Sequence, residues 1–285
     1  MVGHGRSFHL GRDWPGLLLW LFGLVCVLFF ILFPLFQMLS TALKGPTEQF
    51  ALPVTFLPGI FTLENFIQAL SYSAFIRYFI NSLSVSLITT VAAVVIALLG
   101  AYGFTRLEFP GRRFFLILIV FSQMFCMAAI IIPIYRILAG LGLIDTYLGL
   151  VIAFLALTVP IAIWLFRSFL QSIPRQLEEA AYIEGASKVT AFWKVVVPLL
   201  QPAVGATGAY VFFLTWQDFL FPLVIMTGKS HRTLPIGIMD FVGQYETNWG
   251  NLMASSILII LPVIIIFTFI QKQLIAGLIE GAIKE

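Results

Sequence analysis

Six long stretches of the chain are rich in apolar residues and contain no charged residue. They cover residues 14–43, 78–105, 114–135, 146–166, 195–217 and 247–271. A helix needs about 20 residues to cross about 30 Å of hydrocarbon, and each stretch meets that length. The apolar residues run continuously and do not alternate in ten-residue segments, which favours helices over the strands of a membrane barrel. We predict an all-α membrane protein with six transmembrane helices near 16–39, 78–104, 114–138, 147–170, 202–226 and 252–275.

The first of these stretches follows Arg6 and Arg12, as the apolar core of a secretory signal peptide would. Its apolar part, residues 17–39, is too long for such a core, and no convincing cleavage site follows it. We therefore expect a retained membrane anchor.

Lysine and arginine residues are divided unevenly between the two ends of the predicted helices. If the N-terminus is inside, the inner segments hold 11 of the 16 and the outer segments hold 5. Since cytoplasmic loops carry the excess of Lys and Arg, both termini are predicted to be cytoplasmic. The chain then divides into an N-terminal segment 1–15, a membrane domain 16–275 and a C-terminal tail 276–285.

Composition supports a membrane protein and excludes several other classes. Apolar residues make up 60% of the chain and charged residues 10%, with a mean hydropathy of +1.03. Soluble domains contain about 45–50% apolar and about 25% charged residues, so lipid is the expected solvent. A net charge of +3, spread along the chain, argues against nucleic-acid binding. The two cysteines and three histidines lack metal-ligand spacing, so we expect no metal site.

The predicted inner segment 171–201 is too polar to cross the membrane and too regular to be a simple connector. Pro174 suits the start of a helix, and Gly185 can end it in a left-handed conformation. Ser187 can cap a second short helix, which Pro198 separates from the fifth span. The pattern predicts two short helices bent at a glycine. Amphipathicity alone would also fit a loop that rests on the membrane surface.

The spacing within this segment resembles the EAA loop of ABC importer permeases, the membrane subunits of ATP-driven uptake systems. Glu179-Ala180-Ala181 is followed four residues later by Gly185 and then by a Val-x-Val-Pro sequence that ends at Pro198. The resemblance implies coupling helices that sit in a cleft of the ATP-hydrolysing subunit. The residues expected to serve this coupling are Glu179, Ala180, Ala181, Glu184, Gly185, Ala186, Phe192 and Pro198.

Motifs along almost the whole chain are similar to the carbohydrate-uptake branch of these permeases, and most similar to the maltose-type second subunit. They lie at 62–66, 77–82, 109–112, 141–147, 216–219, 247–250 and 277–284. In that subunit the C-terminal tail reaches between the ATPase subunits, which here implies Gly281 and Lys284. The tail departs from the pattern at Ile279-Glu280 and at the terminal Glu285, and Gln217 replaces the usual asparagine of the fifth span.

The resemblance also implies a set of partners in a bacterial inner membrane. These are a second, homologous permease subunit that completes a heterodimer, homodimeric ATP-binding subunits and an extracytoplasmic solute-binding protein. The substrate class is a sugar, an oligosaccharide, or a sugar- or glycerol-derived phosphate or sulfonate. The chain contains no Gly-x-x-x-x-Gly-Lys-Ser/Thr sequence, so ATP and Mg²⁺ are expected on the partner ATPase. No cofactor and no catalytic residue are expected in this chain, which is predicted to be a transport subunit and not an enzyme.

Polar side chains within the predicted spans are candidates for lining a substrate pathway, because a polar solute needs polar groups that face a cavity. The candidates are Asn81, Ser82, Ser86, Thr89, Gln123, Gln217 and Asp218. Hydroxyl groups also form hydrogen bonds within and between membrane helices, so a structural role is open for each. A charge in hydrocarbon costs about 3 kcal/mol, so Asp218 requires a partner or water. Gln123, a backbone group and the substrate are its candidate partners.

Two other function classes fit a multi-span membrane protein. An ion-coupled secondary transporter would act without an ATPase, but it usually carries several intramembrane ionisable residues and internal repeats. Asp218 is nearly alone in the spans, and no convincing repeat is visible. An intramembrane enzyme would need a Ser/His or paired-Asp arrangement in the spans, and the sequence offers neither.

Overall fold

The computed structural model describes residues 14–53, 55–72, 74–243 and 247–282, and the regular secondary structure of these residues is helical apart from one bridge between Val242 and Thr247. The long helices are α1 (Trp14–Ala42), α3 (Phe75–Arg106), α6 (Tyr147–Ser172), α10 (Gln201–Gln217) and α13 (Trp249–Ala282). Between them lie α2 (Glu64–Ser71), α4 (Arg112–Ser122), α5 (Met127–Gly140), α7 (Gln176–Ile183), α8 (Lys188–Ala191), α9 (Val197–Leu199), α11 (Leu220–Ile225) and α12 (Leu234–Gly237). Shorter helical turns cover Glu48–Phe50, Phe192–Val196 and Ile238–Phe241.

Helix α3 is the centre of the molecule. It packs along α6 on one side and α10 on another, and α10 packs in turn on α13. Ala93, Ala97 and Ala101 are fully buried on α3 and let the neighbouring helices approach closely. At Gly100 a Cβ atom would lie 3.2 Å from the Cδ1 atom of Ile163 on α6, so a larger residue would require the Ile163 side chain to shift.

Four helices are long and apolar enough to cross a membrane by themselves, and the number rises to six if two bent pairs each count as one span. The bent pairs are α4 with α5, at 107°, and the α8–α9 segment with α10, at 74°. The helical class of the prediction is therefore confirmed for the described residues. The predicted continuous helix over 114–138 is wrong, because residues 123–126 leave the helical conformation.

Local hydrogen bonds of the turn type accompany the break between α4 and α5. The Ser122 hydroxyl donates to the carbonyl of Ile119 at 2.7 Å, and the Met124 N–H donates to the carbonyl of Phe121 at 3.0 Å. Both bonds join residues three positions apart, as in a turn, and compete with the hydrogen bonds of an α-helix, which join residues four positions apart. Cys126 then adopts an extended conformation (ψ 136°), from which α5 begins in a new direction.

A second predicted helix, 202–226, is also divided, since α10 ends at Gln217 and α11 begins at Leu220. Asp218 is extended (ψ 132°), and its Oδ2 atom accepts a hydrogen bond of 2.9 Å from the N–H of Phe221. An aspartate that accepts from a first-turn N–H is a favourable helix N-cap. The side chain thus ends one helix and starts the next.

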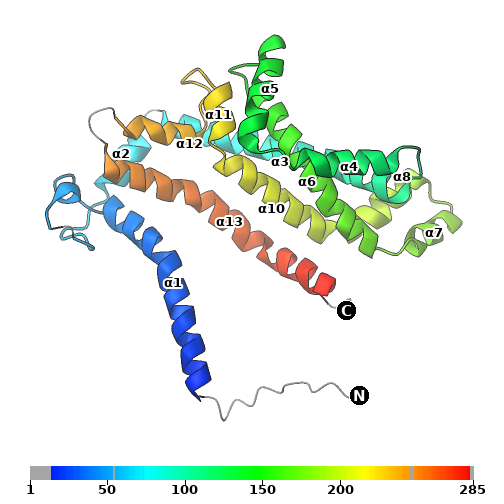
Figure 1. Cartoon of the computed structure of the whole chain (residues 1–285), viewed down its shortest axis with the longest axis horizontal. Coiled ribbons are helices and arrows are strands. Elements are labelled where there is room, and N and C mark those ends of the chain that lie inside the picture. Colours follow the sequence, from blue (N-terminus) through cyan, green and yellow to red (C-terminus); the bar gives the residue numbers. More distant parts are fainter. Residues whose placement is uncertain (1–13, 54, 73, 244–246, 283–285) are drawn as a thin grey trace.

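Helix α1 leaves the helical bundle along most of its length (Figure 1). Only its end at Ala42 packs against the bundle, in a small buried cluster with Ala69 of α2 and Ala254 of α13. Farther along, apolar side chains are open to solvent, for example Leu19 at 77% and Phe30 at 81% exposed. An apolar surface of this size requires lipid or another chain to cover it.

Candidate functional site

The polar segment 171–201 folds into short helices joined by a left-handed glycine, as predicted. Gly185 has φ +88°, and the N–H of Ala186 donates to the carbonyl of Ala181 at 2.9 Å, which closes the end of α7. The hydroxyl of Ser187 accepts a hydrogen bond of 3.2 Å from the N–H of Thr190 and so caps α8. The following π-helical turn, Phe192–Val196, leads through α9 into the bend before α10.

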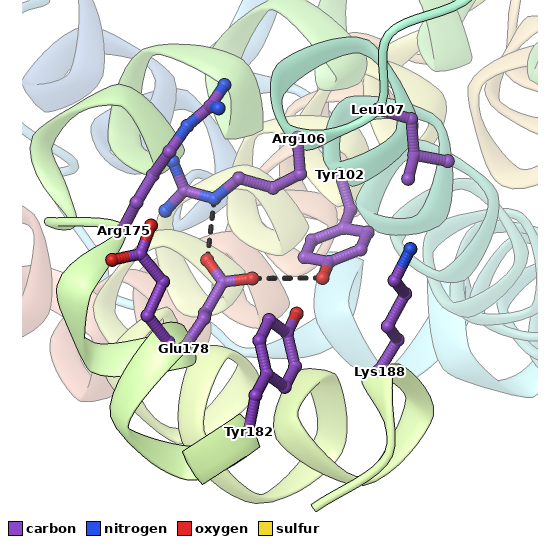
Figure 2. A pocket seen from close by; sticks show the side chains of 8 residues that line it. Tyr102, Arg106, Leu107, Arg175, Glu178, Tyr182 and Lys188 are labelled. Carbon is purple, nitrogen blue, oxygen red and sulfur yellow. Dashed lines mark hydrogen bonds and ion pairs between the residues drawn. The ribbon is translucent and has the colours of Figure 1, made fainter.

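A buried ion pair joins this segment to the end of α3. Arg106 is the last residue of α3, and its Nε atom lies 2.6 Å from Oε1 of Glu178 on α7. The second carboxylate oxygen, Oε2, accepts a hydrogen bond of 2.9 Å from the hydroxyl of Tyr102. Glu178 is only 4% exposed. Figure 2 shows the arginine and the tyrosine converging on this carboxylate, so both of its oxygens are occupied within the chain.

Two arginine side chains also donate to backbone carbonyls, one in each direction, between the end of α3 and the residues after α6. Arg106 donates through Nη2 to the carbonyl of Ile173 at 2.9 Å. In the opposite direction, Nη2 of Arg175 donates to the carbonyl of Thr105 at 3.0 Å. The last carbonyls of a helix have no partner within the helix and carry partial negative charge, so an arginine stabilises them.

The ring of Tyr102 connects the ion pair to the second half of the segment. It contacts the ring of Phe192 edge to face, with centroids 4.7 Å apart. Phe192 is buried in the main apolar cluster, between α3, α6 and the start of α10. Beside the ion pair is an open cavity of about 210 Å³, which is also lined by Tyr182 and Lys188 (Figure 2).

The residues that the sequence predicts for coupling fall into two groups. Glu179, Ala180, Glu184 and Gly185 are exposed together on α7 and the bend, Ala181 and Ala186 are half-buried, and Pro198 is exposed. Phe192, in contrast, belongs to the core. The open surface of the segment also includes large apolar side chains, with Ile183 at 88% and Val189 at 67% exposed. Such a surface is typical of an interaction site.

Sequence reasoning missed the residues that hold this segment in place: Tyr102, Arg106, Arg175 and Glu178. Two signals were available. Tyr102 and Arg106 are four residues apart and so share one face of the last turns of α3. The neighbouring carboxylates of Glu178 and Glu179 point in different directions from a helix, so only one of them can face a partner.

The candidate pathway residues on α3 are buried in this structure. Asn81 donates to the carbonyls of Ser230 (3.0 Å) and Arg232 (2.9 Å), and its Oδ1 atom accepts from the hydroxyl of Tyr147 at 2.8 Å. The hydroxyl oxygen of Ser82 accepts a 2.7 Å bond from the N–H of Leu234. Two further buried hydroxyls, those of Ser86 and Thr89, have no hydrogen-bond partner among the described residues.

The remaining pathway candidates lie at the two helix breaks. Gln123 is exposed at the break between α4 and α5, while Gln217 is exposed and Asp218 half-buried at the break between α10 and α11. The hydrogen bond of Asp218 goes to the backbone of Phe221, one of the candidate partners considered for it.

The N-terminal end of α3 is fastened to the segment after α11. Asp240 receives a bond from Nη1 of Arg232 at 2.9 Å and bonds from the hydroxyls of Tyr72 and Tyr78 at 3.1 Å each. These contacts keep the segment against α3.

Asp145, in the turn before α6, binds the same segment. Its Oδ1 atom accepts a hydrogen bond of 2.9 Å from the N–H of Gly228, and Oδ2 lies 3.2 Å from Nδ1 of His231. Burial of the carboxylate raises its pKa, but the bond from Gly228 and the nearby His231 outweigh burial, so the pKa of Asp145 lies below its ordinary value.

The predicted tail residues lie at the edge of the described chain. Gly281 falls in the last turn of α13, and Lys284 lies outside the described residues. Within the described part of the chain, no three His, Cys, Asp or Glu side chains are placed to hold a metal ion.

Comparisons with known proteins agree on one class. A family model described as "Binding-protein-dependent transport system inner membrane component" matches residues 91–279. The Inner membrane ABC transporter permease protein YcjP of Escherichia coli is 33% identical over 92% of this chain and 94% of its own length. An arabinooligosaccharides transport system permease protein, AraQ of Bacillus subtilis, is 32% identical over 100% of both chains. The sulfoquinovosyl glycerol transport system permease protein SmoH of Agrobacterium fabrum is 34% identical over 89% of each.

Two solved structures share the fold. A chain of a bacterial ABC transporter involved in alginate import superposes with a TM-score of 0.78 and 23% identity, over 95% of this chain and 99% of that chain. A chain of the bacterial alginate ABC transporter in complex with an alginate pentasaccharide-bound periplasmic protein gives a TM-score of 0.67 and 14% identity, over 91% and 93%.

Proposed function

Because the chain belongs to the family of binding-protein-dependent transport system inner membrane components, we propose that it forms half of the translocation pathway for a sugar or sugar-like solute. It is a multi-pass inner-membrane permease subunit of an ABC importer, and it is not an enzyme, since ATP hydrolysis belongs to a separate subunit. This membership makes ATP the energy source and removes the ion-coupled alternative.

Hydroxyl-rich solutes are the proposed substrate class. The relatives are named for the transport of arabinooligosaccharides, sulfoquinovosyl glycerol, trehalose and diacetylchitobiose. Such solutes cross lipid only where polar side chains replace their water. We assign this role to Asn81, Ser82, Ser86, Thr89, Gln123, Gln217 and Asp218. The buried hydroxyls of Ser86 and Thr89 support it, because they have no hydrogen-bond partner among the described residues and can bind a solute when the helices move apart.

The proposed topology has six spans: α1, α3, α6 and α13, the bent pair of α4 with α5, and α10 with α11 as the fifth span over 202–226. Domain 16–275 lies between a cytoplasmic N-terminal segment 1–15 and a cytoplasmic tail 276–285, in a bacterial inner membrane. The excess of Lys and Arg at the inner ends supports this orientation. It puts the segment 171–201, between the fourth and fifth spans, in the cytoplasm.

The proposed assembly contains a second, homologous permease subunit, two identical ATP-binding subunits and an extracytoplasmic solute-binding protein. ATP and Mg²⁺ bind to the ATPase subunits. The exposed apolar surface of α1 supports a neighbour within the membrane, either lipid or the second permease subunit. The tail with Gly281 and Lys284 is proposed to reach between the ATPase subunits.

We assign coupling to the segment 171–201, hereafter the coupling segment. Its open surface carries Glu179, Ala180, Glu184 and Gly185, with Ala181 and Ala186 beside them. Phe192 holds the second half of the segment on the bundle, and the exposed Pro198 leads toward α10. The observation that carries the assignment is this surface of small, acidic and apolar side chains outside the spans. An ATPase cleft that binds it moves the helices when the two ATPase subunits close, because the contact energy differs between conformations.

Affinity purification from detergent-solubilised native membranes, followed by mass spectrometry, tests this function. We expect the tagged chain to recover an ATPase, a second multi-span permease and, with substrate present, a solute-binding protein. Recovery of the chain alone, or as a homo-oligomer without an ATPase, would contradict the proposed function.

A further inference from the structure

We propose that Glu178 is a positioning residue that fastens the coupling segment to α3, so that movement of the partner ATPase reaches α3 directly. The proposal rests on the function assigned above to the coupling segment. It concerns the inward side of α7, whereas the proposed contact with the ATPase concerns the outward side.

The geometry separates the two neighbouring glutamates. Glu178 is 4% exposed, and both of its carboxylate oxygens have partners on α3. Glu179 is exposed on α7. Successive residues on a helix are turned by about 100° from each other, so one carboxylate faces the bundle while the next is available to a partner.

The attachment has two crossing points, which makes it resistant to rotation. At the first, Glu178 holds Arg106, whose guanidinium also holds the carbonyl of Ile173. At the second, Arg175 holds the carbonyl of Thr105 from the opposite direction. A single side-chain bond would let α7 pivot about it, whereas two separated crossings fix its direction relative to α3. The flat, forked guanidinium makes such a double contact, and a lysine cannot reproduce it.

The covalent connections of α7 do not reach α3. On one side the chain leads through Ile173 into α6, and on the other it leads through a π-helical turn and a 74° bend into α10. A π-helical turn and a sharp bend are places where a helix can change direction, so this connection transmits movement less rigidly than a straight helix. The ion pair adds a direct route to α3, which packs against both α6 and α10 and carries the buried hydroxyls of Ser86 and Thr89.

Substrate uptake per ATP hydrolysed, measured in proteoliposomes with the assembled importer and its solute-binding protein, tests the proposal. We expect Glu178→Gln to lower this ratio about tenfold while hydrolysis continues, a size of effect within the range for residues that couple distant sites. Tyr102→Phe removes one donor and keeps the ring contact with Phe192, so a decrease of about threefold is expected. Glu108→Gln is the matched control, since this carboxylate is exposed just beyond Arg106, and its ratio should equal that of the wild type.

A double variant separates positioning from mere stability. Removal of one member of a buried ion pair leaves an unpaired charge, whereas apolar residues at both positions often restore stability. Glu178→Met with Arg106→Met should therefore assemble at the yield of the wild type and still couple poorly. A ratio at the wild-type level in this assembled double variant, or in Glu178→Gln, would overturn the proposal. If the wild-type chain itself recovers no ATPase, the proposed function fails before this inference is reached.

Discussion

The neighbouring carboxylates of Glu178 and Glu179 show how much one helical position changes the surroundings of a side chain. Glu178 is enclosed by an arginine and a tyrosine of α3, while Glu179 lies on the open surface of α7. A doublet of glutamates in the sequence gives no indication of which one is buried. The Glu-Ala-Ala spacing predicted a coupling role for Glu179. The structure adds Glu178, which binds Arg106 and Tyr102 of α3.

The exposed carboxylate leads to a first prediction. Glu179→Lys reverses a charge on the surface that we assign to the ATPase, and juxtaposed like charges across an interface cost several kcal/mol. We expect at least about a tenfold loss of ATPase recovered with the tagged chain, because 1.4 kcal/mol corresponds to a factor of ten. The amount of the chain in the membrane should not change, since among the described residues it is Glu178, and not Glu179, that forms the ion pair with α3. An unchanged ATPase recovery would contradict the role of Glu179.

Asp218 permits a second prediction, because its capping role and its proposed solute contact respond differently to substitution. Asn keeps an oxygen that accepts from Phe221, so Asp218→Asn should unfold at the temperature of the wild type. Asp218→Ala removes the cap and should lower stability by about 1 kcal/mol. Thermal unfolding in detergent measures both. Altered transport kinetics in the stable Asn variant would assign the carboxylate to the pathway, and unchanged kinetics would leave it a structural cap.

Asp145 gives a pH-dependent prediction. Its pKa is lower in the folded protein than in the unfolded chain, so its contribution to stability is fully present above the ordinary value of about 3.9 and is lost as the pH falls through the lower folded value. As the pH is lowered below about 3.9, the unfolding temperature of Asp145→Asn should therefore fall less steeply than that of the wild type. Unfolding curves of both proteins over this range, in the same detergent, provide the measurement. Parallel curves would show that Asp145 does not contribute.

At the scale of elements, the short helices of the coupling segment could be predicted and the breaks in the long spans could not. A proline, a glycine and a capping serine mark the ends of α7 and α8 in the sequence, and each acts locally. The break between α4 and α5 has no such marker, because Ser122 and Gln123 are compatible with a helix. The break at Asp218 depends on which N–H its side chain caps, and a pattern of apolar residues does not record that choice.

Gly185 carries the prediction for this scale. Its φ of +88° strains a residue with a side chain, and the left-handed region costs about 1–2 kcal/mol, more for a β-branched residue. Among the described residues, apart from its two chain neighbours, no heavy atom lies within 4 Å of the position of a Cβ, so the cost comes from the backbone. Gly185→Val should lower ATPase recovery and coupled transport. Gly185→Asn is the matched control, because asparagine tolerates this conformation, and it should stay close to the wild type. Equal losses in both variants would show that the side chain, not the backbone, matters.

At the scale of the whole molecule, apolar stretches predicted the membrane class, and a family resemblance predicted the importer. The relation of α1 to the bundle could not be predicted, because an apolar helix in lipid is stable whether or not it packs on its neighbours. Nor could the sequence show that Asn81 and Ser82 hold the segment after α11 in this structure. Those contacts join residues that are 149 and 152 positions apart in the sequence.

ATP-driven uptake by the purified assembly tests the central claim most directly. The tagged chain, with the partners that it recovers, would be reconstituted in proteoliposomes, and sugars first selected by binding to the solute-binding protein would be offered with and without ATP. We predict accumulation that requires ATP and the binding protein and is indifferent to ion gradients. Accumulation driven by an ion gradient in the absence of any ATPase would contradict the account.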